Sequence, residues 1–260
     1  MPLLQGMEEF QNVSAGLQWA IFIVGCLIAI VAAISVGISI WLFVQYLTFN
    51  RTINSRNLSG KDAARIILDK HGLQHIRVSV VGSMLFGNSY SHYFKKVRLR
   101  RLTTNKNSIT SLAMGAQKSA LAILDKEGDK DMQARVILTP LVYFGPLAFI
   151  PIIALGVIID ILFFNFSGVA TLVASILGLS IYAVSFALSI MTLKTEKKAQ
   201  DRACQILKQE NMATDQEIGM MKELFKLYNI QYINDIVLEL LQLIMRALQI
   251  AAKAQQNAKD

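Results

Sequence analysis

The sequence predicts a membrane α-helical protein with a small α+β region on the cytoplasmic side. Of its 260 residues, 53% are hydrophobic and only 17% are charged, which is apolar for a soluble domain of this length. Three apolar runs, at 17–47, 140–164 and 169–193, each reach the roughly 20 residues that a helix needs to cross a bilayer. We therefore expect an N-terminal transmembrane anchor at 1–49, a cytoplasmic region at 50–137, a transmembrane hairpin at 138–193 and C-terminal helices at 194–260.

Basic residues near the ends of the runs set the expected orientation. Glu8 and Glu9 precede the first run without any Lys or Arg, whereas Arg51, Arg56 and Lys61 follow it. Because basic residues are enriched on the cytoplasmic side, the N-terminus should lie outside and residues 50–137 and 194–230 inside. The first run has no basic segment before it and is too long for a signal peptide, so we expect it to remain as an anchor.

Two features predict how the apolar helices pack. Small residues recur every four positions in the first run, at Gly25, Ala29, Ala33 and Gly37, so they share one face on which another helix can approach closely. The partner is the hairpin or another chain. Only the segment 165–168 separates the second and third runs, and such a short connection requires an antiparallel pair.

The region 50–137 begins with an expected helix and a small sheet. Ser59 followed by Asp62 is typical of a capped helix start. Strands are expected at 76–81 and 97–102, because their apolar residues alternate with polar ones. One face of this sheet should be wet and basic, formed by Lys96, Arg98 and Arg100.

The next segment, 109–124, has the 3.6-residue apolar period of a buried or half-buried helix. It carries no strong metal ligand and no good general base.

The region is also rich in positive charge. From Arg51 to Arg135 there are 16 Lys or Arg against six Asp or Glu. Nucleic acid is one conceivable partner, but anionic lipid headgroups explain basic residues beside a membrane more simply. We therefore expect anionic lipids and no nucleic acid as partners.

The C-terminal part should contain amphipathic helices at 196–208 and 215–228 and a longer one at 233–252. A polar stripe at alternating spacings of four and three runs along this last helix. Three placements are open: the membrane interface, a crossing with the stripe turned toward other helices or water, and soluble packing. The stripe consists of Asp235, Glu239, Gln242, Arg246, Gln249 and Lys253.

Isolated polar residues give little sign of a cofactor, and we expect none. His71 and His75 have Gly72 between them, where a helix should end, so they are expected on the surface and not on a metal. Asp160 lies near the end of its run, at headgroup depth or, alternatively, on an ion or proton route.

Four segments carry a resemblance to a known family. NSRNLSGKDAARIILDKHGL at 54–73, SHYFKKVRL at 91–99, SLAMGAQKSALAI at 111–123 and TLKTEKKAQDRACQIL at 192–207 follow one another around the hairpin. In this order they resemble the bacterial membrane zinc metallopeptidases of the YugP type. The corresponding family stretches read much like NSxGLTGxEVARxIL, DHYDP before a VRLS strand, and AHEVGHA. The resemblance implies a zincin-like helix and sheet in a bacterial inner membrane.

The resemblance also implies where the catalytic groups should stand. The family's zinc-binding histidines fall on Gly115 and Ser119, its catalytic glutamate on Ala116, and its third ligand on Glu196. In an HExxH site two histidines one turn apart hold the metal while the glutamate activates its water. Three of these four groups are missing, so we expect no metal and no enzymatic activity.

The expected function is that of an inactive pseudopeptidase, acting as a structural, assembly or regulatory subunit in a homo- or hetero-oligomer with other membrane proteins. Its strand at 95–102, with Lys96, Arg98 and Arg100, would be a sheet edge that holds a segment of the partner. One alternative is an active metallopeptidase with a non-standard site that uses His92 and Glu196. Another is an oligomeric ion or solute pathway lined by the polar stripe.

Overall fold

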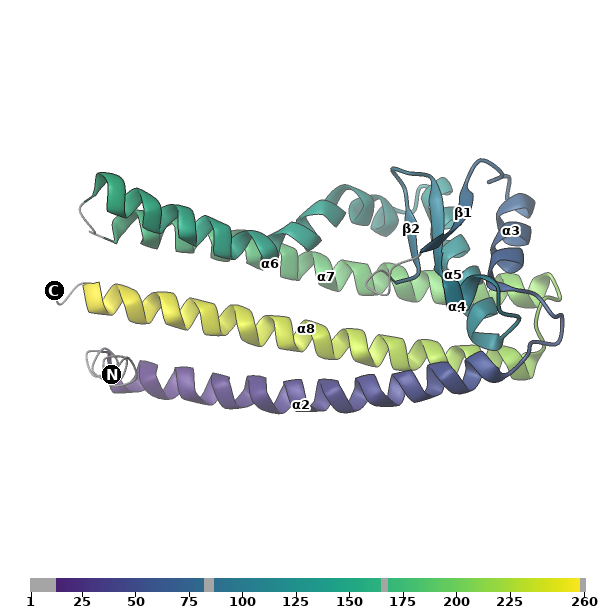
Figure 1. Ribbon diagram of the computed structural model, residues 1–260, viewed down its shortest axis with the longest axis horizontal. Helices are drawn as coiled ribbons and strands as arrows, with labels where there is room; N and C mark the ends of the chain where they lie inside the picture. The colour runs from purple at the N-terminus through teal and green to yellow at the C-terminus, as the bar shows by residue number, and fades with distance from the viewer. Residues whose placement is uncertain (1–12, 82–86, 165–167, 258–260) are drawn as a thin grey trace. The chain divides into compact units, whose positions relative to one another are not determined.

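The computed structural model describes residues 13–81, 87–164 and 168–257. Glu8, Glu9 and most of the predicted turn at 165–168 lie outside the described residues. The chain divides into two compact units: unit 1 has residues 1–36, 138–190 and 234–260, and unit 2 has residues 37–137 and 191–233. The elements, all but β3 labelled in Figure 1, are α2 (Ala15–Arg51), α3 (Gly60–Lys70), β1 (Arg77–Val81), β2 (Ser89–Ser91), β3 (Lys96–Arg100), α4 (Arg101–Thr104), α5 (Ile109–Lys126), α6 (Lys130–Phe163), α7 (Val169–Gln209) and α8 (Asp215–Asn257).

Two of the described helices, α2 and α7, are long and apolar enough to cross a membrane, and a shorter apolar stretch, Ala148–Phe163, lies within α6. The prediction of separate C-terminal helices is wrong in its boundaries. α7 continues through 193–196 without a break, and α8 joins 215–228 and 233–252 into one helix. Neither junction contains Gly or Pro, so nothing there interrupts the backbone hydrogen bonds of a helix.

In unit 1, α6 and α7 pack as the predicted antiparallel pair. A Cβ added at Gly156 would lie 2.6 Å from the Ala174 Cβ, and one added at Gly178 would lie 3.0 Å from the Phe149 ring. The later residue of α7 therefore meets the earlier residue of α6, which requires opposite directions. The absence of a side chain at both glycines lets the two helices approach closely.

Asp160, near the end of α6, holds the start of α7. Its carboxylate accepts hydrogen bonds from the backbone N–H groups of Ala170 at 2.9 Å and Thr171 at 2.7 Å. A carboxylate is favourable at this end of a helix, where free N–H groups and the positive end of the helix dipole coincide. Asp160 thus has a structural role that requires no ion or proton route.

The middle of the polar stripe on α8 packs within unit 1. The Tyr182 hydroxyl donates a hydrogen bond to Gln242 Oε1 at 3.3 Å. The Arg246 guanidinium lies 4.1 Å from the Phe149 ring centre and 4.9 Å from that of Tyr182, a cation–π arrangement. Glu239, Gln242 and Arg246 are half-buried, whereas Asp235, Gln249 and Lys253 at the two ends of the stripe are exposed.

The row of small residues on α2 is mostly uncovered. A Cβ at Gly25 would lie 3.6 Å from Met245 Cε on α8, but no described atom lies within 4 Å of one at Gly37. Ala29 and Ala33 are exposed. Among the residues that the structure describes, a helix contact at this row is found at Gly25 and not at Gly37.

Unit 2 contains a three-stranded sheet in the order β1-β3-β2. β1 is parallel to β3, with Val78 opposite Val97, and β2 is antiparallel to β3, with Tyr90 opposite Val97. The prediction of a sheet edge at 95–102 is therefore wrong, because β3 is the central strand. The expected alternation is confirmed: Val97 and Leu99 are fully buried, while the neighbouring basic residues are not.

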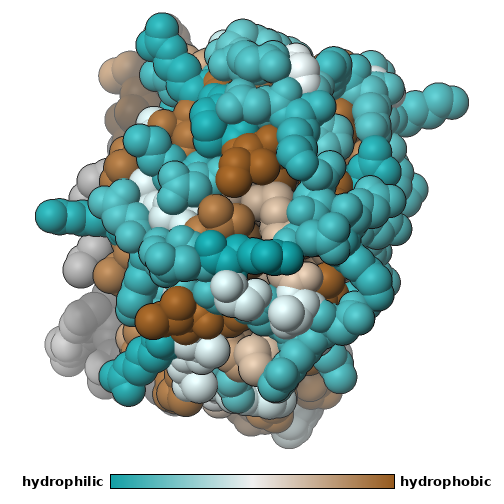
Figure 2. Space-filling view, turned by 90° about the vertical axis from the view of Figure 1, so that its right-hand side faces the viewer, coloured by the Kyte–Doolittle hydropathy of each residue, from teal (hydrophilic) through white to brown (hydrophobic). Residues whose placement is uncertain are grey.

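The core of unit 2 lies between α3, α5, β3 and the parts of α7 and α8 that belong to this unit. Fully buried Ile67, Leu112, Leu121, Leu207 and Leu224 come from four of these helices. The predicted cap of α3 is present as a reciprocal capping box between Ser59 and Asp62. The face in Figure 2, on the side where α3 lies, is mostly hydrophilic with small apolar patches.

Candidate functional site

The segment 109–124 forms the buried centre of unit 2. Its helix α5 starts after Ser108, whose side chain accepts a hydrogen bond from the Ser111 N–H, and every residue from Ile109 to Leu124 is buried. This confirms the expected buried helix. The side chains of α5 divide between one side that packs on α3 and another that faces α7.

The side toward α3 is a close crossing of two backbones. A Cβ added at Gly115 would collide with the Gly60 carbonyl oxygen. One turn further along, Ser119 Oγ donates to the Gly115 carbonyl at 2.9 Å and lies 3.4 Å from that of Ala64 on α3. Ala116 is fully buried. The three positions to which the family's HExxH groups were assigned are therefore filled by packing.

The side toward α7 carries the charges. Glu196 Oε2 accepts hydrogen bonds from Gln117 Nε2 at 2.8 Å and from Lys118 Nζ at 2.9 Å. Its other oxygen accepts one from Arg135 Nη2 at 2.7 Å. Only 15% of the Glu196 side chain and 10% of that of Lys118 are exposed. The structure thus brings Glu196 to Gln117 and Lys118, and not to Gly115 or Ser119.

The protonation of Glu196 follows from this arrangement. Burial alone would raise the pKa of its carboxyl, but the positive charges and hydrogen bonds of Lys118 and Arg135 outweigh burial and lower the pKa to about 2. Glu196 is therefore ionised at neutral pH. One carboxylate is compensated by two cations, as a buried charge requires.

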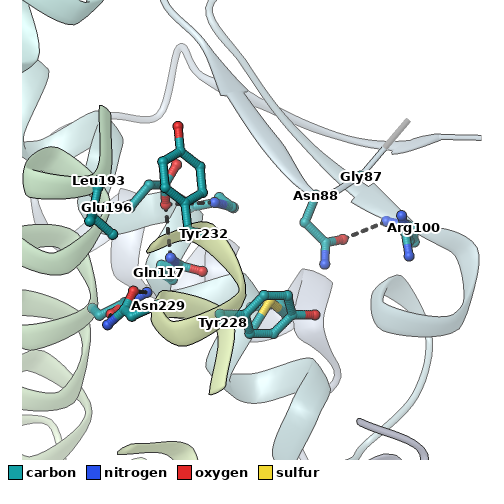
Figure 3. A pocket seen from close by; sticks show the side chains of 12 residues that line it. Gly87, Asn88, Arg100, Gln117, Leu193, Glu196, Tyr228, Asn229 and Tyr232 are labelled. Carbon is teal, nitrogen blue, oxygen red and sulfur yellow. Dashed lines mark hydrogen bonds and ion pairs between the residues drawn. The ribbon is translucent and has the colours of Figure 1, made fainter. Parts of the chain in front are cut away.

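A pocket of about 270 Å³ opens beside this ion pair in unit 2. In Figure 3, Glu196, Gln117 and Tyr232 lie on one side of it and Asn88 and Arg100 on the other. Asn88 Oδ1 accepts a hydrogen bond from the Arg100 backbone N–H at 2.8 Å, which ties the segment before β2 to the end of β3. The lining residues are Gly87, Asn88, Arg100, Met114, Gln117, Lys118, Leu193, Glu196, Gln200, Tyr228, Asn229 and Tyr232.

The residues present do not fit a zinc ion. Structural and catalytic zinc sites use three or four Cys, His, Asp or Glu ligands. Across 13–81, 87–164 and 168–257, no three such residues come together in a way that could hold a metal. Both oxygens of Glu196 are already bound by cations. Zinc would have to displace Lys118 and Arg135 and would then find a single ligand.

His92 belongs to a separate cluster near the other end of α5. Its Nδ1 lies 2.6 Å from Asp125 Oδ2, which also accepts a hydrogen bond from the Tyr90 hydroxyl at 2.6 Å. Burial, together with this carboxylate, raises the pKa of Tyr90. His92 and Glu196 therefore have different partners, and the structure does not join them as the non-standard metal site would require.

The remaining predicted residues are placed as follows. Lys96 and Arg98 are half-buried and Arg100 is exposed, and only Arg100 lines the pocket. His71 Nδ1 lies 2.9 Å from the Ile67 carbonyl oxygen at the end of α3, and His75 is exposed, as expected for surface histidines.

Sequence reasoning missed Gln117, Lys118 and Arg135. One signal was available, because Lys118 is the only charged residue between Ile109 and Leu124. A lysine inside a buried helix is rarely left without a counter-charge. Its partner, 78 positions away on α7, could not be identified without the fold.

Comparison with protein families gives one result. The model of a family described as putative neutral zinc metallopeptidase matches residues 6–251, while comparison with curated proteins and with solved structures gives no match. This description points to a protease and contradicts our prediction that the chain is not an enzyme. Because the match covers nearly the whole chain, the protein belongs to this zinc metallopeptidase family.

Proposed function

We propose that the protein sits in the bacterial plasma membrane and binds extended segments of other membrane proteins in the pocket beside Glu196. Binding of an extended segment is the step that peptidases share with proteins that recognise a peptide without cutting it. The pocket in unit 2, next to the helix to which the resemblance assigns the family's motif, is the observation on which the proposal rests.

The lining of the pocket suits a polypeptide. Asn88, Gln117, Gln200 and Asn229 offer both donors and acceptors for peptide groups. Leu193 and Met114 supply apolar surface. A concave site with a few polar groups on a largely apolar wall is typical of ligand sites.

The sheet offers a place for the rest of a bound segment. Gly87 and Asn88 line the pocket and lead directly into β2. Within the described part of the chain, β2 pairs with β3 alone, so its outer side is an edge to which an extended chain can add as a strand. This edge replaces the one we expected at 95–102.

The net charge of the pocket lining indicates which peptide segments should bind most tightly. Arg100, Lys118 and Glu196 are the charged residues among those that line the pocket. Their sum is one positive charge, so segments with an acidic side chain should bind more tightly than basic ones.

The membrane location rests on the apolar helices. α2 and α7 have the length and composition of spans, and the basic residues after Arg51 and from Lys194 onward support a cytoplasmic position for unit 2. A pocket next to Leu193, where the apolar run of α7 ends, would meet segments that emerge from a bilayer.

The test uses the full chain in lipid nanodiscs and short fluorescent peptides that differ only in a central Asp or Lys. Fluorescence anisotropy should rise for both peptides, and more for the acidic one. Asn88→Trp, which fills the pocket, should abolish binding, whereas His75→Trp on the exposed surface should leave it intact. Mass spectrometry of the same samples, with and without a zinc chelator, shows whether the bound peptide is cut. Equal binding by the Asn88→Trp variant and the wild type would refute the proposed site.

A further inference from the structure

We propose that the turn between β2 and β3 is a membrane-contacting loop, in which Tyr93 and Phe94 enter the headgroup layer of an anionic bilayer and the adjacent cations bind lipid phosphates. The inference rests on the membrane location proposed above and adds a contact surface to it.

The tip of this turn exposes two neighbouring aromatic side chains. Tyr93 and Phe94 are each 65% exposed. The turn is closed by hydrogen bonds from the Phe94 N–H to Ser91 Oγ at 3.4 Å and from the Lys95 N–H to the His92 carbonyl at 3.3 Å, and Lys95 has a positive φ of 46°. Adjacent and exposed aromatic side chains are typical of an interaction surface. Tyr in particular is enriched where membrane meets water.

The residues that follow the aromatics are cationic. Lys95 is exposed, and the Arg98 guanidinium lies 5.3 Å from the centre of the Phe94 ring. The segment 91–101 contains five Lys or Arg and no Asp or Glu. Aromatic side chains flanked by basic ones match the two layers of an anionic membrane surface, which are the apolar region and the phosphates.

The position of the turn relative to α6 selects a lipid surface over a soluble partner. The Tyr93 hydroxyl donates to the Val136 carbonyl oxygen at 3.3 Å. The sequence of α6 changes from charged to apolar at this residue. Lys130, Asp131 and Arg135 precede it, whereas 136–159 contain no charged residue. Ile137, the next residue, is 69% exposed. The aromatic tip is thus fixed at the level where an apolar helix begins.

A second helix, α7, also passes from apolar to charged residues near the charged start of α6. The apolar run of α7 ends at Leu193, and the next residue, Lys194, forms an ion pair with Asp131 on α6 at 3.1 Å. The ion pair thus lies in the charged part of α6, five residues before Val136, whose carbonyl oxygen accepts the hydrogen bond from Tyr93 at the boundary. A membrane surface at the boundary between the charged and apolar parts of α6 would contact the Tyr93 and Phe94 side chains.

The experiment measures the depth of a single tryptophan. The chain has two tryptophans, Trp19 and Trp41, which are replaced by Phe before Phe94→Trp is introduced. The full-length variant is reconstituted into phosphatidylcholine vesicles with or without phosphatidylglycerol, and with a doxyl quencher placed near the headgroup or deep in the acyl chains. Ile150→Trp in the apolar part of α6 and Gln216→Trp at the exposed start of α8 serve as controls.

We expect the Trp at position 94 to be quenched more strongly by the headgroup-proximal quencher than by the deep one. Its emission should shift to the blue when phosphatidylglycerol is present, and Lys95→Gln with Lys96→Gln should remove this dependence on anionic lipid. The probe at 150 should be quenched and the probe at 216 should not. If 150 is quenched and 94 is not, the membrane-contacting loop is refuted while the membrane location stands. If neither is quenched, the membrane location fails, and this inference fails with it. Equal quenching of 94 in neutral and anionic vesicles refutes the role of the cations.

Discussion

The carboxylate of Glu196 provides the sharpest test of the site, because its charge is set by two identified neighbours. Replacing it by Gln keeps the shape of the side chain but removes the negative charge that Lys118 and Arg135 bind. The pKa of Glu196 falls from an ordinary 4.5 to about 2. Since one pKa unit corresponds to about 1.4 kcal/mol, the ionised form contributes about 3 kcal/mol to the stability of unit 2.

The sign of the pH dependence follows from the direction of the shift. A carboxyl whose pKa is lower in the folded state stabilises that state above its unfolded pKa, here 4.5, and this contribution is lost as the pH falls toward 2. About 2 kcal/mol should already be lost at pH 3. The Glu196→Gln variant should be less stable at pH 7 by about 3 kcal/mol and should lack this part of the acid transition.

Cys204 offers a local probe of unit 2. It is buried, with 6% of its surface exposed, and lies on the same helix as Glu196. In a Cys26→Ala background, its labelling by a dithiodipyridine reagent, which reacts with thiols in acid, measures opening of the unit in nanodiscs as urea is raised. Asp215→Asn removes an exposed carboxylate that pairs with Lys208 and should leave the curve close to that of the wild type. If the Glu196→Gln variant keeps the pH profile of the wild type, the ion pair is not the source of the stability.

Two further outcomes follow from the two sides of α5. Gly115→Ala should destabilise unit 2 by about 1–3 kcal/mol, as judged by labelling of Cys204, because the added Cβ collides with the Gly60 carbonyl. Gln117→His combined with Lys118→Glu and Leu121→His should create a site for about one zinc ion per chain, measured by elemental analysis, because positions 117 and 121 lie one helical turn apart and the Gln117 side chain contacts Glu196.

Matched variants separate these effects from general damage. Gly219→Ala, at a helical glycine with no described atom within 4 Å of the new Cβ, should be neutral or stabilising. The alternative triple variant, with His, Glu and His at 115, 116 and 119, should bind no zinc, because those positions pack on α3. If the variant at 115, 116 and 119 binds zinc and the variant at 117, 118 and 121 does not, the family's metal positions are those assigned from the sequence, and the side of α5 inferred from the structure is wrong.

The parts of the fold that rest on local chemistry could be predicted from the sequence. The capping box of Ser59 and Asp62, the alternation around Val97 and the apolar runs all reflect short-range patterns. β2 was not predicted, because Ser89–Ser91 has no apolar residue beyond Tyr90 and follows residues typical of a turn. The helix breaks expected near 194 and 230 are absent, since polarity alone does not interrupt a helix.

Only part of the candidate site could be predicted from the sequence. The family resemblance predicted that α5 and Glu196 belong to the site. Which side of α5 meets Glu196 depends on how α7 packs, because Gln117 and Glu196 are 79 positions apart in the sequence. A displacement of two residues along a helix rotates a side chain by more than half a turn. Assigning the reactive positions to 115, 116 and 119 therefore selected the side that packs on α3.

The crossing of α3 and α5 also bears on how this chain can change over time. Gly60 and Gly115 touch through their backbones, and a Cβ on either would collide with main-chain oxygen. A single substitution at Gly115 forces α5 away from α3, and one at Gly60 forces α3 away from the carbonyl oxygens of Thr103 and Ser111 on α4 and α5. A larger side chain at Gly115 therefore requires a shift of α3 as well, which a single substitution does not provide. The crossing thus restricts which single substitutions the chain can accept at these two glycines.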